Sequence, residues 1–200
     1  MSLQIYNSLS DQKEPFNPVH EGQASLYVCG PTVYSDSHLG HAKAYVSFDV
    51  ILRYLRFCGL KTLYVQNITD VGHLMGDADE GEDKLLKRAR ELNQEPMAVA
   101  ESYSRRHFEA MDLLGVIRPD ISPRATGHIP EQLEAIEKLL EHGLAYESNG
   151  SVYFEITKDP KYGELSNRKV EEMKSGARVK VRSEKRHPGD FALWKRAEPG

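Results

Sequence analysis

Two histidines, His38 and His41, enclose Gly40 at the point where a long helix is predicted to begin. The first turn of a helix has free N–H groups and the positive end of the helix dipole, so it favours the phosphates of a nucleotide. Gly40 lacks a Cβ atom where a flat base could lie on the backbone. Two imidazoles can donate hydrogen bonds to a triphosphate, and more strongly to its α-phosphate as charge builds in the transition state. By itself the pattern also fits two helix-start histidines that bond only backbone or solvent.

Cys29 is the last residue of one predicted buried strand and Thr69 follows another, and both carry reactive or hydrogen-bonding groups. A lone cysteine at a strand end is often a small apolar core residue, and a threonine there often caps a turn. Cys29 together with the two histidines and His73 has the donor types that tetrahedral zinc accepts, although the spacing matches no familiar structural zinc pattern. The residues alone leave core, capping and metal-binding roles open.

The segments around these residues predict a βαβ unit. Residues 25–29 and 62–68 are short apolar runs rich in β-branched and aromatic side chains, as in buried strands, and residues 41–58 are apolar at helical spacing. Such crossovers are right-handed in about 98% of cases, so the two strands lie parallel and their carboxyl ends share one edge. We therefore expect an α/β fold with a parallel sheet, in which Cys29 and Thr69 meet at that edge.

Proline and glycine divide the rest of the chain. The breaks at Arg118-Pro119 and Ser122-Pro123 make residues 116–124 the expected boundary, so the predicted domains are residues 1–115 and 116–200. Asn149-Gly150 suits the positive φ angles of a type I′ turn and predicts a hairpin. The further expected elements are helices over residues 82–92, 96–114 and 130–142, hairpin strands over 144–147 and 152–156, and an exposed strand over 178–182.

Helical spacing also predicts which side chains of two helices face solvent or core. Asp49, Arg53 and Arg56 are spaced to form one solvent-facing stripe on the helix over residues 41–58. In the helix over residues 96–114, His107 shares an apolar face whose other members are Ala100, Tyr103, Met111 and Leu114.

The overall composition excludes several protein classes. The 200 residues carry 26 Lys and Arg against 30 Asp and Glu, a formal net charge of −4 that provides no overall basic footprint. Only two cysteines are present, so the chain is no disulfide-stapled secreted domain. Because it has no apolar run of about 18 residues and no signal-peptide pattern at its start, we expect a cytoplasmic protein without a membrane span.

Five short motifs follow one another in a fixed order along the chain. They are Tyr27-Val28-Cys29-Gly30-Pro31-Thr32-Val33-Tyr34, His38-Leu39-Gly40-His41, Asn67-Ile68-Thr69-Asp70-Val71, Ala125-Thr126-Gly127-His128-Ile129-Pro130 and Phe191-Ala192-Leu193-Trp194-Lys195. Their order resembles that of the cysteinyl-tRNA synthetases, a family of class I aminoacyl-tRNA synthetases. The resemblance implies an ATP-dependent ligase that activates cysteine as cysteinyl adenylate, with magnesium expected beside ATP, and passes the cysteinyl group to the terminal adenosine of its tRNA. It also implies half of a Rossmann-like catalytic domain over residues 1–115 and an inserted connective subdomain, facing the acceptor stem of tRNA, over residues 116–200.

The same resemblance assigns substrate-binding roles to five residues. His38 and His41 would stabilise the adenylation transition state and, with Gly40, bind ATP. Gly30 and Thr69 would lie against the bound cysteine.

The resemblance further implies a zinc ion, with Cys29 as one of its ligands. Zinc would accept the thiolate of the substrate, which serine cannot match because it lacks a soft sulfur donor. The family's other zinc ligands, its K-M-S-K-S loop and the second half of its nucleotide fold follow the Phe191–Lys195 motif, whereas Cys58 lies inside a predicted helix and matches none of them. We therefore expect the chain to be an inactive front portion of an enzyme whose C-terminal half is missing.

A basic stretch over residues 168–196 is the expected contact with tRNA. Its basic side chains outnumber the acidic ones ten to four, and phosphates attract Lys and Arg without sequence selectivity. The plain alternative is a solvated surface of mixed charge. The acidic segment over residues 76–83 is interpreted as a solvated loop that leads into a helix. Two other functions stay open at this point: a cysteine–amino-sugar ligase of the mycothiol type, and a non-catalytic RNA-binding module.

Overall fold

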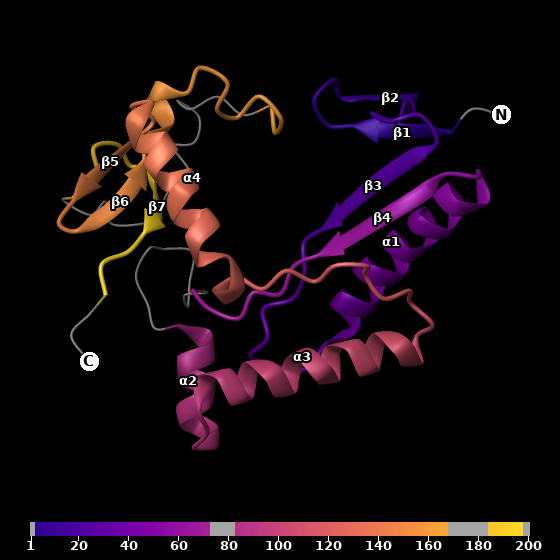
Figure 1. The fold of residues 1–200 in the computed structure, drawn as a ribbon, viewed down its shortest axis with the longest axis horizontal. Helices are drawn as coiled ribbons and strands as arrows, with labels where there is room; N and C mark the ends of the chain where they lie inside the picture. Colours follow the sequence, from indigo (N-terminus) through magenta and orange to yellow (C-terminus); the bar gives the residue numbers. More distant parts are fainter. Residues whose placement is uncertain (1–2, 73–82, 168–183, 198–200) are drawn as a thin grey trace. The chain divides into compact units, whose positions relative to one another are not determined.

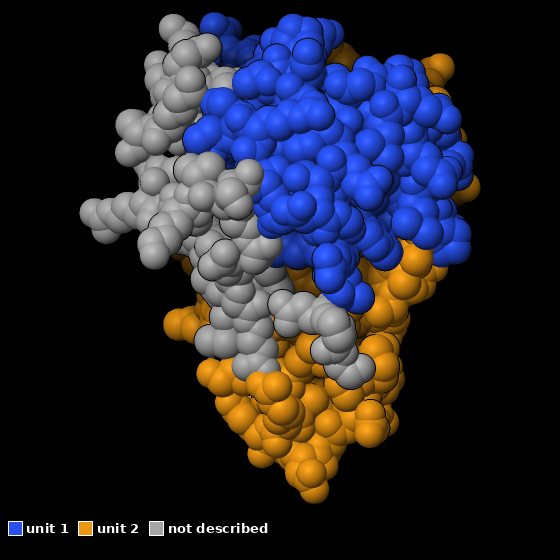
Figure 2. All heavy atoms as spheres, turned by 90° about the vertical axis from the view of Figure 1, so that its left-hand side faces the viewer, with its two compact units in different colours: residues 1–16, 77–79, 130–200 blue, residues 17–76, 80–129 orange. Residues whose placement is uncertain are grey.

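The computed structural model describes residues 3–72, 83–167 and 184–197, whose fold is shown in Figure 1. These residues divide into two compact units, which Figure 2 shows in different colours. Among them, unit 1 contains residues 3–16, 130–167 and 184–197, and unit 2 contains residues 17–72 and 83–129. The chain passes from unit 2 to unit 1 between Ile129 and Pro130, and a domain boundary at residue 115 stays a prediction.

Unit 2 is built on the predicted βαβ unit. Strand β3 (Gln23–Val28) pairs in parallel with β4 (Lys61–Gln66), and helix α1 (Leu39–Phe57) connects them. The expected α/β fold with a parallel sheet is confirmed, and the carboxyl ends of both strands share one edge (Figure 1). The helix and the two strands bury the apolar side chains Ala24, Val28, Tyr45, Leu52, Leu55 and Tyr64.

The predicted polar stripe on α1 is wrong at Asp49, whose side chain is only 10% exposed. One of its carboxylate oxygens accepts a hydrogen bond from the backbone N–H of Ile117 at 2.9 Å, and the other accepts one from Arg53 Nε at 2.6 Å. Arg53 also donates to the carbonyl oxygen of Gly115 at 2.7 Å. Asp49 and Arg53 therefore fasten α1 to a segment far along the chain, while Arg56 stays exposed.

Two more helices complete the core of unit 2. Helix α2 (Lys84–Leu92) begins after Asp83, whose carboxylate accepts from two backbone N–H groups of the first turn, and α3 (Pro96–Leu113) has proline at its start. His107 is buried on α3 as expected, but Leu114 lies at the end of the helix and is half exposed. The packed side chains are Val33, Ile68, Leu85, Ala89, Val99, Ala100 and Tyr103.

Residues 116–124 pack in unit 2 and run along β4. The backbone N–H of Gln66 donates to the carbonyl oxygen of Ile121 at 3.0 Å, and that of Ile68 donates to the carbonyl oxygen of Pro123 at 2.8 Å. Backbone N–H groups alternate in direction along a strand, so these bonds lie on the edge of β4 that does not face β3. The two X-Pro breaks thus belong to an extended segment beside the sheet.

Unit 1 contains most of helix α4 (Ile129–Glu141) and two antiparallel sheets. Strands β5 (Ala145–Ser148), β6 (Ser151–Phe154) and β7 (Phe191–Trp194) form one sheet in that order, and β1 (Gln4–Asn7) pairs with β2 (Gln12–Pro15). The hairpin turn is confirmed, with φ of 51° at Asn149 and 80° at Gly150, whereas β1, β2 and β7 were not predicted. Two short 3-10 helices are η1 (Thr126–His128) and η2 (Ile156–Lys158), and the strand expected over residues 178–182 lies outside the described residues.

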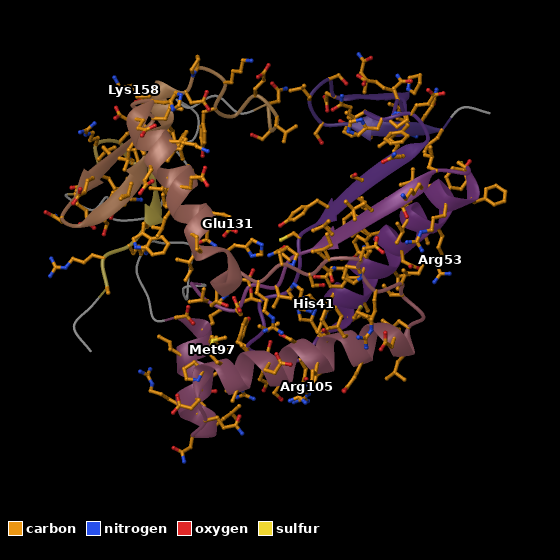
Figure 3. All side chains as sticks on the ribbon, viewed as in Figure 1. His41, Arg53, Met97, Arg105, Glu131 and Lys158 are labelled. Atoms are coloured by element: carbon orange, nitrogen blue, oxygen red, sulfur yellow. The ribbon has the colours of Figure 1, made fainter. Side chains whose placement is uncertain are left out.

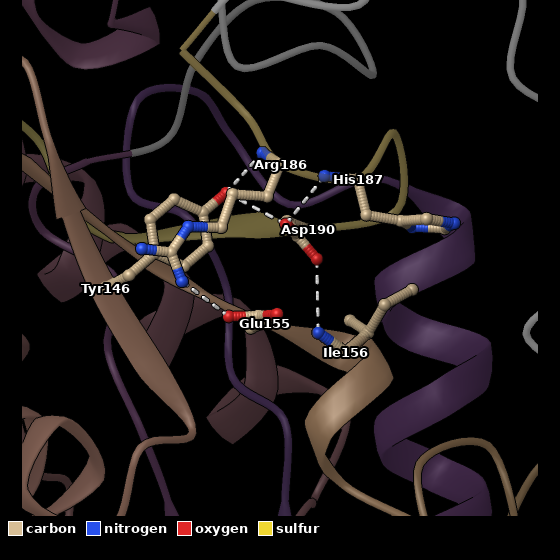
Figure 4. A network of polar contacts seen from close by, with 6 residues as sticks. All are labelled: Tyr146, Glu155, Ile156, Arg186, His187 and Asp190. Carbon is tan, nitrogen blue, oxygen red and sulfur yellow. Dashed lines mark hydrogen bonds and ion pairs between the residues drawn. The ribbon is translucent and has the colours of Figure 1, made fainter.

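The buried carboxylate of Asp190 connects segments of the sheet formed by β5, β6 and β7 (Figure 4). It accepts hydrogen bonds from the hydroxyl of Tyr146 at 2.8 Å, from the backbone N–H of Ile156 at 3.1 Å and from that of His187 at 3.0 Å. The backbone N–H of Arg186 donates to the Tyr146 hydroxyl at 2.8 Å.

Among the described residues, every helix is too short or too polar to be a candidate membrane span.

Candidate active site

The two histidines lie at the start of α1 and cap it with their rings (Figure 3, His41). Nδ1 of His38 accepts a hydrogen bond from the backbone N–H of Gly40 at 3.0 Å, and Nδ1 of His41 accepts one from the backbone N–H of His38 at 3.2 Å. The ring centroids are 4.0 Å apart. A neutral imidazole that accepts at Nδ1 carries its proton on Nε2. Both rings can therefore offer an Nε2–H donor beside the positive end of the helix.

The structure supplies a second reason for glycine between the histidines. A Cβ atom at Gly40 would lie 2.8 Å from Cε1 and 2.9 Å from Nδ1 of His38. Any side chain here would displace the His38 ring from its capping position. Gly40 thus keeps the first turn of α1 open and holds the imidazole against it.

Burial favours the uncharged form of His41. The pKa of His41 lies below its usual value because the ring is partly buried and because a charged His38 would repel a second charge nearby. At neutral pH we therefore expect His41 to be uncharged and to act as a hydrogen-bond donor through Nε2.

Asn67 brings Gly30 and Thr69 together at the carboxyl edge of the parallel sheet. Its Oδ1 accepts hydrogen bonds from the backbone N–H of Gly30 at 2.8 Å and from the hydroxyl of Tyr27 at 3.0 Å. Its Nδ2 donates to Oγ1 of Thr69 at 3.2 Å. The backbone N–H of Thr69 also donates to the carbonyl oxygen of Pro31 at 3.0 Å. The two residues expected to contact cysteine are thus held by one amide side chain, a role that the sequence alone did not reveal.

Cys29 lies at the same edge, and its thiol is exposed and not part of a disulfide. The Sγ atom is 3.8 Å from the carbonyl oxygen of Gly30, a weak contact that leaves the sulfur available to a ligand. In the parts of the chain that the structure describes, no three His, Cys, Asp or Glu side chains come together as a metal site. Cys29, His38 and His41 therefore form no joint site, and His73 lies outside the described residues.

Tyr45 connects the sheet edge to the histidine pair. Its hydroxyl donates to the carbonyl oxygen of Cys29 at 3.3 Å, and its ring lies nearly parallel to that of His41 with centroids 6.3 Å apart. Burial raises the pKa of Tyr45 to about 12, so the hydroxyl keeps its proton and acts as a donor. One helix thus positions two imidazole donors, while its inner face holds the backbone next to the thiol. This arrangement suits an anionic phosphate at the start of α1.

The predicted RNA-binding stretch is only partly described, because residues 168–183 lie outside the described part of the chain. Arg186 is described and is engaged within unit 1: its guanidinium lies 4.2 Å from the ring centroid of Tyr146 and pairs with the carboxylate of Glu155 at 2.9 Å. Arg186 is thus occupied by protein contacts. Most of the acidic loop is likewise outside the described residues, and its last residue, Asp83, caps α2.

Comparison with known proteins identifies related sequences along almost all of the chain. The family described as tRNA synthetases class I (C) catalytic domain matches residues 15–200. A cysteine–tRNA ligase of Chlorobaculum tepidum is 61% identical over 204 residues, and one of Thermus thermophilus is 57% identical over 200 residues. Each alignment covers 100% of this chain and 42% of the relative, so the chain spans less than half the length of these relatives.

Two solved structures have a similar fold at low sequence identity. A putative arginyl-tRNA synthetase from Campylobacter jejuni has a TM-score of 0.50 at 15% identity, covering 69% of this chain and 39% of that one. An Agrobacterium radiobacter LeuRS, solved as a ternary complex, has a TM-score of 0.51 at 19% identity, covering 71% of this chain and 18% of that one. At these identities the similarity concerns the fold alone.

Proposed function

The chain belongs to the family of class I (C) tRNA synthetase catalytic domains, and we propose that it forms the cysteine- and ATP-binding part of a cytoplasmic cysteine–tRNA ligase. One observation carries the proposal: Tyr45 links the ring of His41 to the backbone of Cys29, and Asn67 links Gly30 to Thr69 at the carboxyl edge of the parallel sheet. Such an edge is where open α/β sheets bind their ligands.

In the reaction we propose, the carboxylate of cysteine attacks the α-phosphate of ATP. A carboxyl–phosphate anhydride forms, the bond to pyrophosphate breaks, and pyrophosphate leaves; a ribose hydroxyl of tRNA then takes the cysteinyl group and AMP leaves. The Nε2–H groups of His38 and His41 would donate to the phosphates as charge builds there, with magnesium as the expected counter-ion. Gly30 and Thr69 would orient cysteine, and Gly40 would leave the base room at the helix start.

Zinc enters the proposal only through Cys29. The described residues offer one suitable sulfur donor and no complete site, so the remaining donors would have to come from elsewhere. When bound, zinc would supply affinity for the thiolate of the substrate. In the full-length protein, we expect Cys29→Ser to lower the zinc content measured by elemental analysis, while Cys58→Ser leaves it unchanged.

The tRNA partner is proposed from the basic stretch over residues 168–196. We expect replacement of Lys180, Arg182 and Lys185 by alanine to weaken tRNA binding and to flatten its dependence on salt, because each lost phosphate contact removes about one unit of the log–log slope. An unchanged slope would contradict this part of the proposal.

Cysteine-dependent exchange of pyrophosphate into ATP by the full-length protein tests the central proposal. We expect His38→Asn to lower the exchange rate by about 100-fold, because asparagine keeps the helix cap and loses the Nε2–H donor. Cys58→Ser, at the far end of α1, is the matched control and should exchange normally. Full activity of His38→Asn would contradict the proposal.

The same full-length protein tests the two alternative functions. If it joins cysteine to an amino sugar offered in place of tRNA, the mycothiol-type ligase is favoured. If it shows no pyrophosphate exchange at all, the RNA-binding module is favoured.

A further inference from the structure

His107 is a buried histidine of α3 that the proposed reaction does not use. It is 3% exposed, and its Nδ1 lies 2.8 Å from Oγ of Ser37. Ser37 directly precedes His38, the residue that caps α1. The hydrogen bond thus joins α3 to the backbone immediately before the two capping imidazoles, across 70 positions of sequence.

The ring of His107 also contacts the residue that connects the two sides of the candidate site. It packs edge-to-face against Tyr45, with centroids 5.2 Å apart and an interplanar angle of 74°. Tyr45 in turn lies over His41 and donates to the carbonyl oxygen of Cys29. His107 therefore contacts two residues next to the capping histidines: Ser37, which precedes His38, and Tyr45, whose ring lies beside that of His41.

An apolar side chain would suit this place better if packing were its only purpose. Nε2 of His107 is buried and has no hydrogen-bond partner among the described residues. A buried polar atom without a partner lowers the stability of the folded state. The position thus keeps an imidazole despite this cost, and the polar contact it makes is the one with Ser37.

We propose that His107 is a positioning residue that holds Ser37 and Tyr45 so that the His38–His41 turn presents both Nε2–H groups to the phosphates. This inference rests on the proposed function for its catalytic consequence. The Ser37 contact would fix the entry of the chain into α1, and the Tyr45 contact would fix the plane against which His41 lies. His107 itself touches no substrate.

Three variants of the full-length protein separate positioning from packing. His107→Leu fills the core but loses the bond to Ser37, and Ser37→Ala loses the same bond from its other side. His107→Asn places an amide where Nδ1 lies and can keep the bond. Ser104→Ala, which removes a buried hydroxyl that donates to the carbonyl oxygen of Ala100 within α3, is the matched control.

We expect His107→Leu and Ser37→Ala each to lower kcat of pyrophosphate exchange by about tenfold and to change the KM for cysteine less than twofold. The double variant with His107→Leu and Ser37→Ala should be no slower than either single variant, because the two substitutions remove the same hydrogen bond. His107→Asn should recover activity to within about threefold of wild type, and Ser104→Ala should match wild type. Full activity of His107→Leu, or additive losses in the double variant, would overturn the proposal.

Nitrogen-15 NMR of the imidazoles distinguishes failure of this inference from failure of the proposed function, because it needs no activity. In the 200-residue chain we expect His38 and His41 to show the Nε2–H tautomer, and His107→Leu to convert them to a mixture of tautomers. If exchange is absent but the tautomers still shift, the proposed function fails and the positioning role stands. Unchanged tautomers in His107→Leu would refute the positioning role.

Discussion

The backbone of Gly30 lies so close to the segment after β4 that no residue with a Cβ atom fits there. A Cβ atom there would lie 1.5 Å from the backbone oxygen of Asn67, and backbone cannot move aside as a flexible side chain can. We expect Gly30→Ala to lower the free energy of unfolding by about 3 kcal/mol, because the strand end must shift to admit a methyl group. Urea denaturation followed by circular dichroism measures this value.

Gly127→Ala is the control for that substitution. The nearest atom to a Cβ at Gly127 is Cβ of Arg124, 4.0 Å away, which is an ordinary contact. Its free energy of unfolding should stay within about 0.5 kcal/mol of wild type. Equal effects of the two substitutions would mean that the crowding at Gly30 is relieved at little cost.

His107 also predicts how stability depends on pH. Burial, with a smaller effect of the nearby His41, lowers the pKa of His107 from 6.5 to about 4. Above pH 6.5 the ring is neutral in the folded and the unfolded chain. Between pH 6.5 and about 4 the unfolded chain binds a proton that the folded chain does not bind. As the pH decreases through this range, the free energy of unfolding therefore falls by up to about 1.4 kcal/mol per pH unit.

We therefore expect the free energy of unfolding to fall less between pH 7 and pH 5 in His107→Asn than in wild type. The difference should be about 2 kcal/mol, measured by urea denaturation at both pH values. His41 titrates in the same direction but is present in both proteins, so the comparison isolates His107. A pH dependence that is the same in both proteins would contradict the low pKa.

At the scale of the elements, Asp49 holds the segment after α3 against α1. Alanine at this position would leave the backbone N–H of Ile117 and one N–H of Arg53 without their carboxylate acceptor. We expect Asp49→Ala to lower the free energy of unfolding by about 2 kcal/mol, because a partly buried donor loses its partner. Thermal or urea unfolding followed by circular dichroism measures the effect.

Glu134→Ala provides the comparison, because Glu134 and Lys138 form an ion pair at the same i, i+4 spacing on α4. Both of its side chains are more than 60% exposed, so its loss should cost less than about 0.5 kcal/mol. If both substitutions had similarly small effects, the bond from Asp49 to Ile117 would contribute little.

Most elements of unit 2 could be predicted because their signals are local. Asp83 before α2, Pro96 at the start of α3, and the glycines after α1 and α3, which have positive φ, each set a helix end within a few residues. Strand β7 escaped prediction because its four residues become a strand only by pairing with β6, about 40 positions earlier in the sequence. The extended segment beside β4 was missed for the same reason.

The site shows the same division between local and distant signals. The capping role of His38 and the glycine between the histidines follow from residues within one helical turn. Asn67 and His107 act across 37 and 70 positions, so spacing in the sequence could not show what they contact. A histidine on an otherwise apolar helix face was the one available signal for His107, and it predicted burial but not the contact with Ser37.

At the scale of the whole molecule, each compact unit has its own buried core. Unit 2 has the two apolar clusters around Ile68 and Leu52, and unit 1 buries Tyr153, Ile156 and the carboxylate of Asp190. The chain contains a single tryptophan, Trp194, which lies on β7 in unit 1. Its fluorescence therefore reports unfolding of unit 1, whereas circular dichroism reports both units.

We expect Asp190→Ala to lower the urea midpoint seen by Trp194 fluorescence, because three donors lose a shared buried acceptor, at a cost of about 3 kcal/mol. Asp49→Ala, in unit 2, should leave that midpoint unchanged. It should lower only the urea midpoint of the unit 2 transition, which circular dichroism detects in addition to that of unit 1. The reciprocal pattern follows because each substitution weakens one core and leaves the other intact. If Asp49→Ala shifts the Trp194 midpoint as much as Asp190→Ala does, the two cores unfold as one cooperative unit and the expectation of separate transitions is wrong.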